Sequence, residues 1–353
     1  EETRRTLKRQ LPSRLSTTDL MRYGPDAMQQ AWYLGHAALC PAYTNTETAY
    51  FSSGASFFPN FLEELEQAKD YIFLEYFIIA EGSMWSDVLD ILTRKAAQGV
   101  DVRVIYDGVG SAATLPINYP DQLHARGILC RVFQPLLPVL SIHQNNRDHR
   151  KICVVDGKVA FTGGVNLADE YINKKVRFGH WKDTAIKIEG DAVQSFTMMF
   201  LQMWNITERQ PEDYAKYLTE KQPGFSRKDG YIIPYGDSPF DHENVGEEVY
   251  FHILNHAKKY VHIMTPYLIL DNEMIDALTR AAKGGIEVQI IMPHIPDKPY
   301  AFYLAKTYYE ELIAGGVEIY EYTPGFIHAK DYLSDDKVAV VGTINMDLSL
   351  IHI

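Results

Sequence analysis

The sequence predicts an α/β protein made of two similar halves, each an α/β/α sandwich, packed side by side around one shared active site. Two observations lead to this prediction. The segment 149–166 (HRKICVVDGKVAFTGGVN) recurs in altered form as 328–345 (HAKDYLSDDKVAVVGTIN). The stretches before the two copies also match, since each reads as helix, apolar strand, amphipathic helix, glycine turn and apolar strand. Such βαβ units build parallel sheets, and internal repetition indicates that one structural unit is used twice.

The correspondence between the halves fixes the predicted elements in order. In the first half, LEELEQAKDYIFLEYFII precedes a helical stretch that ends in TRKAAQGVDVRVIYDG, and in the second, YFHILNHAKKYVHIMTPYLI precedes one that ends in TRAAKGGIEVQIIMP. Gly99 and Gly285 stand where helix C-caps are expected. The apolar segments 152–155 and 338–341 are predicted to be buried parallel strands. The predicted organisation is a linker segment at 1–45, a first repeat at 46–206, a polar linker at 207–235 and a second repeat at 236–353.

The positions shared between the two motif copies include the five that form the signature. They are His149, Lys151, Asp156, Gly163 and Asn166 in the first copy and His328, Lys330, Asp335, Gly342 and Asn345 in the second. Residues at even separations on a strand share a face, so the histidine and lysine of each copy are expected to point the same way. We expect the two motifs to meet where the halves pack together.

These residue types suit phosphodiester chemistry. Neutral imidazole is a competent nucleophile near pH 7 and can form a covalent phosphoenzyme, while a second imidazole can donate a proton. Lysines offset the charge of the phosphoryl oxygens, and asparagines donate further hydrogen bonds. The near symmetry of the motifs leaves open which histidine attacks.

The paired motifs resemble those of the phospholipase D superfamily, and the surrounding phrases resemble its bacterial cardiolipin synthase branch. These phrases are NNRDHRKICVVDG, RFGHWKDTAIKIEG, ILNHAKKYVHIMTPYLI and VAVVGTINMD. The resemblance extends from about residue 49 to residue 347. It implies two tandem phospholipase D-like repeats that share one active site.

The resemblance also implies roles for individual residues. The implied catalytic residues are His149 as nucleophile, His328 as general acid and then base, and Lys151, Lys330, Asp156 and Asp335, which complete the signature. The implied substrate-binding residues are Asn166, Asn345, Gly164 and Asp183. Asp183 matches the acid that fixes the tautomer of the first-half histidine in family members, and its second-half counterpart lies beyond Asp347. Asp156 and Asp335 are better interpreted as structural residues that tie the motif loops together.

The implied activity is transfer of a phosphatidyl group between two phosphatidylglycerol molecules, giving cardiolipin and glycerol through a phosphohistidine. Water as acceptor would make the protein a phospholipase D-type hydrolase, and a nuclease or other phosphodiesterase of the superfamily is a further alternative. The net charge of −12 disfavours a nucleic-acid partner. A catalytically dead membrane scaffold is disfavoured by the intact motifs. The expected partners are phosphatidylglycerol and anionic membrane lipid.

No metal or other cofactor is expected, because the lysines supply the positive charge and the motifs lack clustered ligands. His252 and His256 have a metal-capable spacing, yet no third ligand is evident, so a solvated helix face is favoured.

No stretch approaches the ~20 apolar residues of a membrane-spanning helix. The initial EETRRTLKRQ is typical of a segment just inside such a helix, and family members carry one or two hydrophobic helices upstream. We therefore expect a fragment of a bacterial cell-membrane protein that lacks its N-terminal membrane helices and its C-terminal end.

Two apolar stretches leave alternatives open. The segment 133–142, broken by two prolines, is predicted to be a loop that forms either an interfacial lip for acyl chains or a buried connector. His143, just after it, is interpreted as an ordinary loop residue rather than a substrate contact. The segment 300–312 is predicted to be an amphipathic helix, more often part of a core than membrane-seeking.

Overall fold

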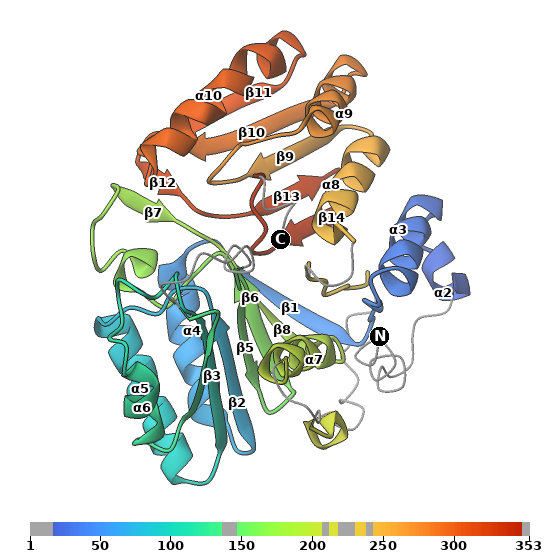
Figure 1. Ribbon diagram of the computed structural model, residues 1–353. Helices are drawn as coiled ribbons and strands as arrows, with labels where there is room; N and C mark the ends of the chain where they lie inside the picture. The colour runs from blue at the N-terminus through green and yellow to red at the C-terminus, as the bar shows by residue number, and fades with distance from the viewer. Residues whose placement is uncertain (1–16, 136–146, 207–211, 218–229, 238–242, 348–353) are drawn as a thin grey trace.

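The computed structural model describes residues 17–135, 147–206, 212–217, 230–237 and 243–347. Two sheets lie one above the other, and the chain passes from the lower half to the upper half (Figure 1). The strands of the lower sheet are β1 (Thr46–Phe51), β2 (Tyr71–Tyr76), β3 (Asp101–Asp107), β4 (Leu129–Phe133), β5 (Lys151–Val155), β6 (Val159–Gly163) and β8 (Ala185–Gly190). Those of the upper sheet are β9 (Tyr260–Met264), β10 (Glu287–Pro293), β11 (Glu318–Tyr322), β13 (Asp331–Ser334) and β14 (Val338–Val341).

The two sheets repeat one strand order. The lower sheet runs β1-β8-β6-β5-β2-β3-β4 and the upper sheet runs β11-β10-β9-β13-β14. Read from the other edge, the order β4-β3-β2-β5-β6 matches β11-β10-β9-β13-β14. In each series the first three strands are parallel, the fourth is antiparallel to the third, and the fifth is antiparallel to the fourth. The predicted fold class, two tandem α/β repeats packed side by side, is confirmed.

The prediction that 152–155 and 338–341 are parallel strands is wrong. Strand β5 pairs antiparallel with both β2 and β6, and β14 pairs antiparallel with β13. The cause is a tight turn after β5, where Asp156 and Gly157 have left-handed φ values of 51° and 62° and the Lys158 N–H bonds to the Val155 carbonyl. An Asp-Gly pair between apolar residues is a strong hairpin signal. Strand β5 is fully buried, as predicted, whereas β14 is half-exposed.

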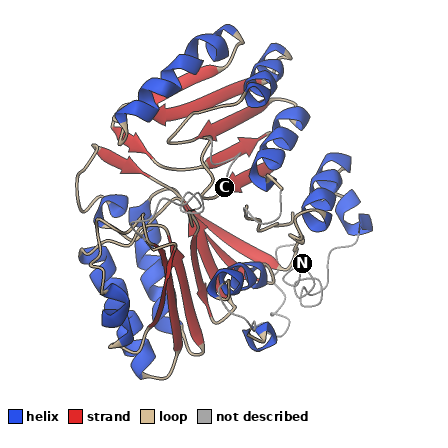
Figure 2. Cartoon of the chain, in the orientation of Figure 1, coloured by secondary structure: helices blue, strands red, loops and turns tan. Residues whose placement is uncertain are grey.

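Helices cover the lower sheet on both faces (Figure 2). Helices α4 (Gly54–Gln67), α5 (Ser83–Ala97) and α6 (Tyr119–His124) pack on one face, and α7 (Val193–Trp204) packs on the other. The upper sheet packs in one apolar cluster with α8 (Val245–His256), α9 (Asn272–Lys283) and α10 (Pro299–Ala314). Among the described residues, α7 has no counterpart on the upper sheet.

Strand pairing and helix packing both link the halves. Strand β7 (His180–Lys182) leaves the lower half and pairs in parallel with β12 (Gly325–Ile327) of the upper half. Near the N-terminus, α2 (Thr17–Met21) is followed by α3 (Pro25–His36), which packs against α8 of the upper half. The domain boundaries given by the sequence remain a prediction.

Helix α10 differs from the core helix that its sequence favoured. Only Ala301, Ala305 and Leu312 are buried, while Tyr300 is 71% exposed and Tyr303 69% exposed. In the part of the chain that is described, every helix is too short or too polar to cross a bilayer.

Candidate active site

The first motif places its histidine and lysine at the junction of the two halves. His149 lies just before β5, and Lys151 is the first residue of that strand. The Lys151 Nζ donates to the His149 carbonyl oxygen at 2.7 Å, so the lysine folds back over the histidine. The Nδ1 of His149 lies 2.9 Å from the backbone carbonyl oxygen of Thr343, which belongs to the second half. Since a carbonyl oxygen only accepts, this contact fixes the proton on Nδ1 and leaves Nε2 with a lone pair.

The second motif repeats this arrangement. His328 follows β12, and Lys330 directly precedes β13. The Lys330 Nζ donates to the His328 carbonyl oxygen, as Lys151 does in the first copy. His328 and both lysines are buried, whereas His149 is half-buried. The structure therefore brings both predicted histidine–lysine pairs to one interface.

Asp183 occupies a different place from the one that the resemblance assigned. Its Oδ2 lies 2.7 Å from the Nδ1 of His328, so it orients the histidine of the opposite half, and the expectation that it orients His149 is wrong. The physical reason is the pairing of β7 with β12, which carries Asp183 across the junction to the residue that follows β12. The two histidines thus have unlike partners, a neutral carbonyl for His149 and a carboxylate for His328.

Burial and the lysines set the protonation of the site. Burial lowers the pKa of His149 well below its usual range, and the charges of Lys151 and Lys330 lower it further. Burial and Lys330 lower the pKa of His328 to about 4, although Asp183 opposes this shift. Both imidazoles are neutral near pH 7 on these grounds. A phosphodiester anion between the lysines would offset their charge and raise both histidine pKa values.

The two lysines carry the positive charge of the site. Burial lowers the pKa of Lys330 to about 8, against the charge of Asp183, which raises it. The pKa of Lys151 is also lowered by burial and by the charge of Lys330. Burial alone would raise the pKa of Asp183, but His328 and Lys330 outweigh it, so that pKa lies below its ordinary value. Two close lysines form a site for an anionic group.

The predicted asparagines line the junction but are held by protein groups. The Asn166 Oδ1 accepts from the Ile78 N–H at 3.0 Å, and its Nδ2 donates to the Tyr171 hydroxyl at 2.7 Å. The Nδ2 of Asn345 donates to Asp347 at 3.3 Å. Asn166 therefore fixes the segment after β2 and the ring of Tyr171.

Gly164 allows the close approach of the two halves at Asp183. A Cβ atom at this position would lie 1.9 Å from the Asp183 Oδ1 and 2.8 Å from the His328 carbonyl oxygen. Any larger residue would push Asp183 away from His328. Gly164 thus lies in the predicted site, where it leaves room for the carboxylate.

Asp156 and Asp335 lie away from the histidines, at the far ends of β5 and β13. Asp156 accepts the backbone N–H groups of 69–71, at 2.8 to 2.9 Å. Asp335 accepts those of 258–260, at 2.7 to 3.0 Å. Each carboxylate therefore holds the segment that leads into the central strand of its own half. These contacts agree with the structural interpretation rather than with a catalytic one.

Several site residues were not found from the sequence. Rings of Tyr171 and Trp181 lie 5.4 and 5.6 Å from the His328 ring, and Phe77 lies 5.0 Å from His149. The sequence signal that could have identified Trp181 is its place in the HWKD phrase, two residues before Asp183. Beside the first motif, Glu75 is fully buried with Arg150 at 3.7 Å, and burial raises its pKa well above the usual range.

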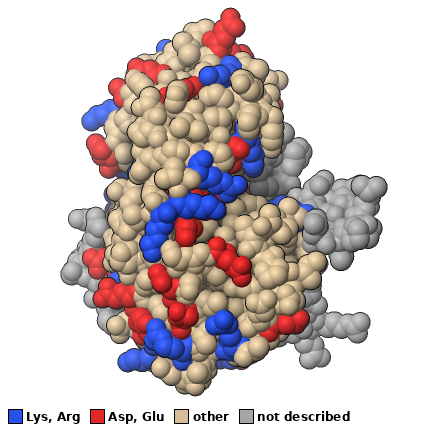
Figure 3. All heavy atoms as spheres, turned by 90° about the vertical axis from the view of Figure 1, so that its left-hand side faces the viewer, with Lys and Arg blue, Asp and Glu red and all other residues tan. Residues whose placement is uncertain are grey.

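A cleft of about 920 Å³ opens beside His149 and Lys151 between the halves, and apolar residues of α7, α8 and β14 line much of it. Lys and Arg side chains also gather at the junction on the face shown in Figure 3. Most of the predicted loop 133–142, and His143, lie outside the described residues.

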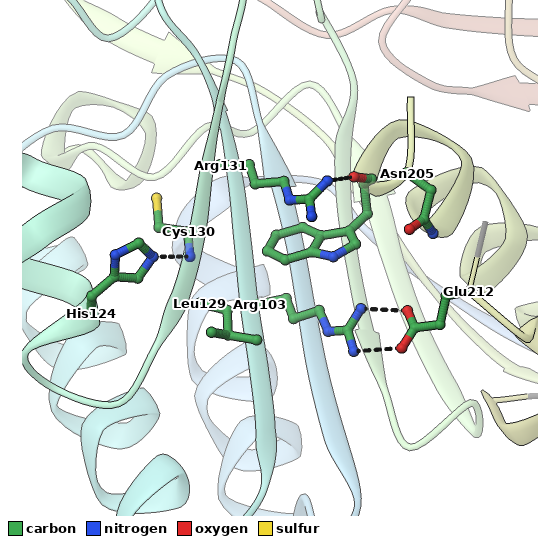
Figure 4. Close-up of a pocket in the computed structure, with 8 residues that line it drawn as sticks. Arg103, His124, Leu129, Cys130, Arg131, Asn205 and Glu212 are labelled. Carbon is green, nitrogen blue, oxygen red and sulfur yellow. Dashed lines mark hydrogen bonds and ion pairs between the residues drawn. The ribbon is translucent and has the colours of Figure 1, made fainter. Parts of the chain in front are cut away.

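A second hollow, of about 530 Å³, lies at the edge of the lower sheet (Figure 4). Its arginines are engaged, since Arg103 bonds to both oxygens of Glu212 and Arg131 bonds to the Trp204 carbonyl. It contains no motif residue.

The described residues contain no group of three or more His, Cys, Asp or Glu side chains that could hold a metal. His252 and His256 stack with ring centroids 4.1 Å apart, and each bonds to a backbone carbonyl oxygen.

The fold and the site define a two-repeat α/β protein in which each repeat supplies one histidine–lysine pair to a common centre. The chain belongs to the family described as cardiolipin synthase, PLD-like domain, whose model matches residues 61–204 and 250–351.

Relatives extend over most of the chain. An uncharacterized protein of Streptococcus mutans is 55% identical over 91% of this chain and 70% of its own length. The cardiolipin synthase of Alkalihalophilus pseudofirmus is 36% identical over 89% of this chain and 62% of its own length. Cardiolipin synthase 2 of Bacillus anthracis is 37% identical over 87% of this chain and 60% of its own length. The chain thus spans about three fifths of the length of these two synthases.

Two solved structures share the fold. Phosphatidylserine synthase of Haemophilus influenzae has a TM-score of 0.57 at 14% identity, over 87% of this chain and 81% of that one. Polyphosphate kinase of Porphyromonas gingivalis has a TM-score of 0.50 at 13% identity, over 96% of this chain and 50% of that one.

Proposed function

We propose that this chain carries the catalytic part of a cardiolipin synthase. It passes a phosphatidyl group from one phosphatidylglycerol to a free hydroxyl of a second, which gives cardiolipin and glycerol. The observation that carries the proposal is the meeting of His149, Lys151, His328 and Lys330 at one junction. The relatives named cardiolipin synthase supply the substrate class.

In the first step, the Nε2 of His149 attacks the phosphorus of the donor lipid. A P–N bond forms, and the P–O bond to the headgroup glycerol breaks. His328, protonated to the imidazolium once the bound phosphodiester offsets the lysine charges, gives its Nε2 proton to the departing glycerol oxygen and becomes neutral. The carbonyl of Thr343 suits His149 for attack because it keeps the proton on Nδ1. The carboxylate of Asp183 suits His328 for proton transfer because it stabilises the imidazolium form.

In the second step, a hydroxyl of the second phosphatidylglycerol attacks the same phosphorus. His328 takes the proton of that hydroxyl, the new P–O bond forms and the P–N bond breaks. His149 and His328 return to their starting states, so the cycle balances without a cofactor. Lys151 and Lys330 hold the nonbridging oxygens through both steps, where negative charge is greatest.

This reaction takes place at a bacterial cell membrane, because both substrates and the product are membrane lipids. The substrates are also the partners we propose for this chain, phosphatidylglycerol and the anionic membrane around it. Among the described residues, the apolar walls of the cleft beside His149 suit a lipid substrate better than a polynucleotide.

The test follows headgroup-labelled phosphatidylglycerol in vesicles with the wild-type protein, His149→Ala and His328→Ala. We expect cardiolipin and glycerol to appear together with the wild type, and each alanine variant to lower the rate about 10²- to 10⁴-fold or more. His294→Ala, at an exposed histidine paired with Glu321, is the matched control and should keep full activity. Phosphatidic acid as the main product would show that the protein is a hydrolase rather than a transferase. The absence of any lipid turnover would reject the proposal.

A further inference from the structure

Asp331 is a buried carboxylate that joins the two halves next to the second motif. It follows Lys330 at the start of β13 and is 8% exposed. Its Oδ2 accepts from the Tyr50 hydroxyl at 3.0 Å, and its Oδ1 accepts from the Thr184 hydroxyl at 2.9 Å. Both partners belong to the first half, one on β1 and one between β7 and β8. Asp331 therefore bonds across the interface with both of its oxygens.

Thr184 links Asp331 to the histidine pair. This threonine is fully buried, and its backbone N–H donates to the Asp183 Oδ1 at 2.9 Å while its hydroxyl donates to Asp331. The other oxygen of Asp183 holds the Nδ1 of His328 at 2.7 Å. His328 and Asp331 are three residues apart in the chain. The contacts thus close a ring that runs from Asp331 through Thr184 and Asp183 to His328.

The first half provides an internal control for this arrangement. The residue after the first motif lysine is Ile152, which is buried in an apolar cluster with residues of α7. A strand that starts behind a motif lysine therefore packs well with an apolar residue at this place. The carboxylate occurs in the half whose histidine is bonded to Asp183, where the opposite half offers two hydroxyl groups.

The charge of Asp331 adds to this evidence. Burial raises its pKa to about 6 and the charge of Asp183 raises it as well, whereas the hydroxyls of Thr184 and Tyr50 and the charge of Lys182 lower it. The group is ionised near pH 7. A buried carboxylate is costly unless it is hydrogen-bonded, so its two hydroxyl partners account for its presence.

We infer that Asp331 is a positioning residue: by bonding to Thr184 and Tyr50 it holds Asp183 against His328, so that His328 delivers its proton to the leaving oxygen. It acts through Thr184 and Asp183 and does not touch the lipid. This inference rests on the proposed function, in which His328 is the general acid.

The test compares two donor lipids that differ in the leaving group. Phosphatidylglycerol loses an alcohol that needs a proton, whereas a phosphatidyl ester of p-nitrophenol loses a stable anion that needs none. We expect Asp331→Val to slow the first step with phosphatidylglycerol about 10- to 100-fold and to slow p-nitrophenolate release less than about threefold. Asp331→Asn keeps an oxygen for one hydroxyl and should recover part of the loss. If the valine variant does not fold, the rates of Asp331→Asn with the two donors provide the test instead.

Thr184→Val and the double variant with Asp331→Val extend the test. Both substitutions break the same Thr184–Asp331 hydrogen bond. The double variant should therefore lower the phosphatidylglycerol rate by less than the product of the two single losses. Asp336→Asn, at an exposed acid in the turn of the same hairpin that accepts from the Tyr260 hydroxyl, is the matched control and should show no dependence on the leaving group.

Two outcomes would overturn the inference. If Asp331→Val and Asp331→Asn each lower the rates with the two donor lipids by the same factor, Asp331 has a purely structural role. If the rates with both donors are unchanged, Asp331 has no role in the reaction. His328→Ala, measured in parallel, separates this inference from the function on which it rests. If His328→Ala lacks the leaving-group dependence, the proposed role of His328 fails. If it shows that dependence and the Asp331 variants do not, only the role of Asp331 fails.

Discussion

The two halves carry one motif, yet they hold their histidines by different means. His149 faces a neutral backbone oxygen of Thr343, whereas His328 faces the carboxylate of Asp183. Each acceptor comes from the opposite half, so neither half could orient its own histidine. Under the proposed mechanism, the asymmetry that a nucleophile and a general acid require comes from these two acceptors and not from the histidines and lysines that the two motifs share.

The same contrast extends to the sheets. In the first half, β6 continues into a pair with β8, and α7 covers the second face of the sheet. In the second half, the described residues give β14 no partner beyond β13. The loop carboxylates differ too, since Asp156 is buried and Asp335 is half-buried. The two halves thus bury their loop carboxylates unequally, and the same substitution at Asp156 and at Asp335 is expected to change stability by different amounts.

The largest effect should come from removing the charge that distinguishes the histidines. Asp183→Asn gives His328 a neutral partner, and we expect the transfer rate to fall about 10³- to 10⁴-fold because the imidazolium loses its stabilising carboxylate. The measurement is the initial rate of cardiolipin formation, with circular dichroism as a control for folding. A loss of less than tenfold would show that the difference between the two partners has little effect on the chemistry.

Substitution of the lysines should affect both halves equally. Lys151→Met and Lys330→Met each remove one cation from the phosphoryl site, and each should lower the rate about 10²- to 10³-fold. The expectation of equal losses follows from the matching bonds of the two lysines to their motif histidines. Losses that differ by more than about tenfold would show that only one lysine holds the phosphoryl group in the transition state.

The pH dependence should separate the second half from the first. The pKa of Lys330 is about 8, so the cation is lost as the pH rises above that value, and kcat/KM should fall about tenfold per pH unit. Asp183 raises this pKa, so the loss should begin at lower pH in Asp183→Asn. Lys330→Arg keeps its charge and should remove the part of this limb that belongs to Lys330, so a limb that remains in this variant belongs to Lys151, whose pKa is also lowered. An unshifted limb in both variants would assign it to another group.

The smallest effects are expected at the loop carboxylates, and on stability rather than on chemistry. Asp156→Ala removes the acceptor of three backbone N–H groups, of which that of Tyr71 is buried and two are partly buried, and should lower the free energy of unfolding by about 2 to 4 kcal/mol. Asp335→Ala, at the more exposed site, should cost about 1 to 2 kcal/mol. Urea unfolding measures both, and turnover per folded molecule should stay unchanged. A rate loss without loss of stability would return these residues to the catalytic group.

The sequence predicted what depends on repetition and local pattern. The two halves, the meeting of the histidine–lysine pairs and the burial of 152–155 follow from the duplicated motif and from apolar runs. The direction of β5 was missed although the Asp156–Gly157 pair signalled a hairpin.

Other features depend on how the halves dock. The partner of Asp183 is set by the pairing of β7 with β12, which joins segments about 145 residues apart. The acceptor for His149 is a backbone oxygen, which no side chain in the sequence reveals. The exposure of Tyr300 and Tyr303 depends on which face of α10 the neighbouring elements leave open.

The most direct measurement is the site of the covalent intermediate. The His328→Ala variant, mixed with a p-nitrophenyl phosphatidyl ester and quenched at neutral to alkaline pH, should accumulate a phosphatidyl group because the second step lacks its base. Peptide mass spectrometry should locate that group on His149, the histidine bonded to the neutral carbonyl. A phosphatidyl group on His328 in the reciprocal His149→Ala variant, with none on His149, would contradict the assignment of roles.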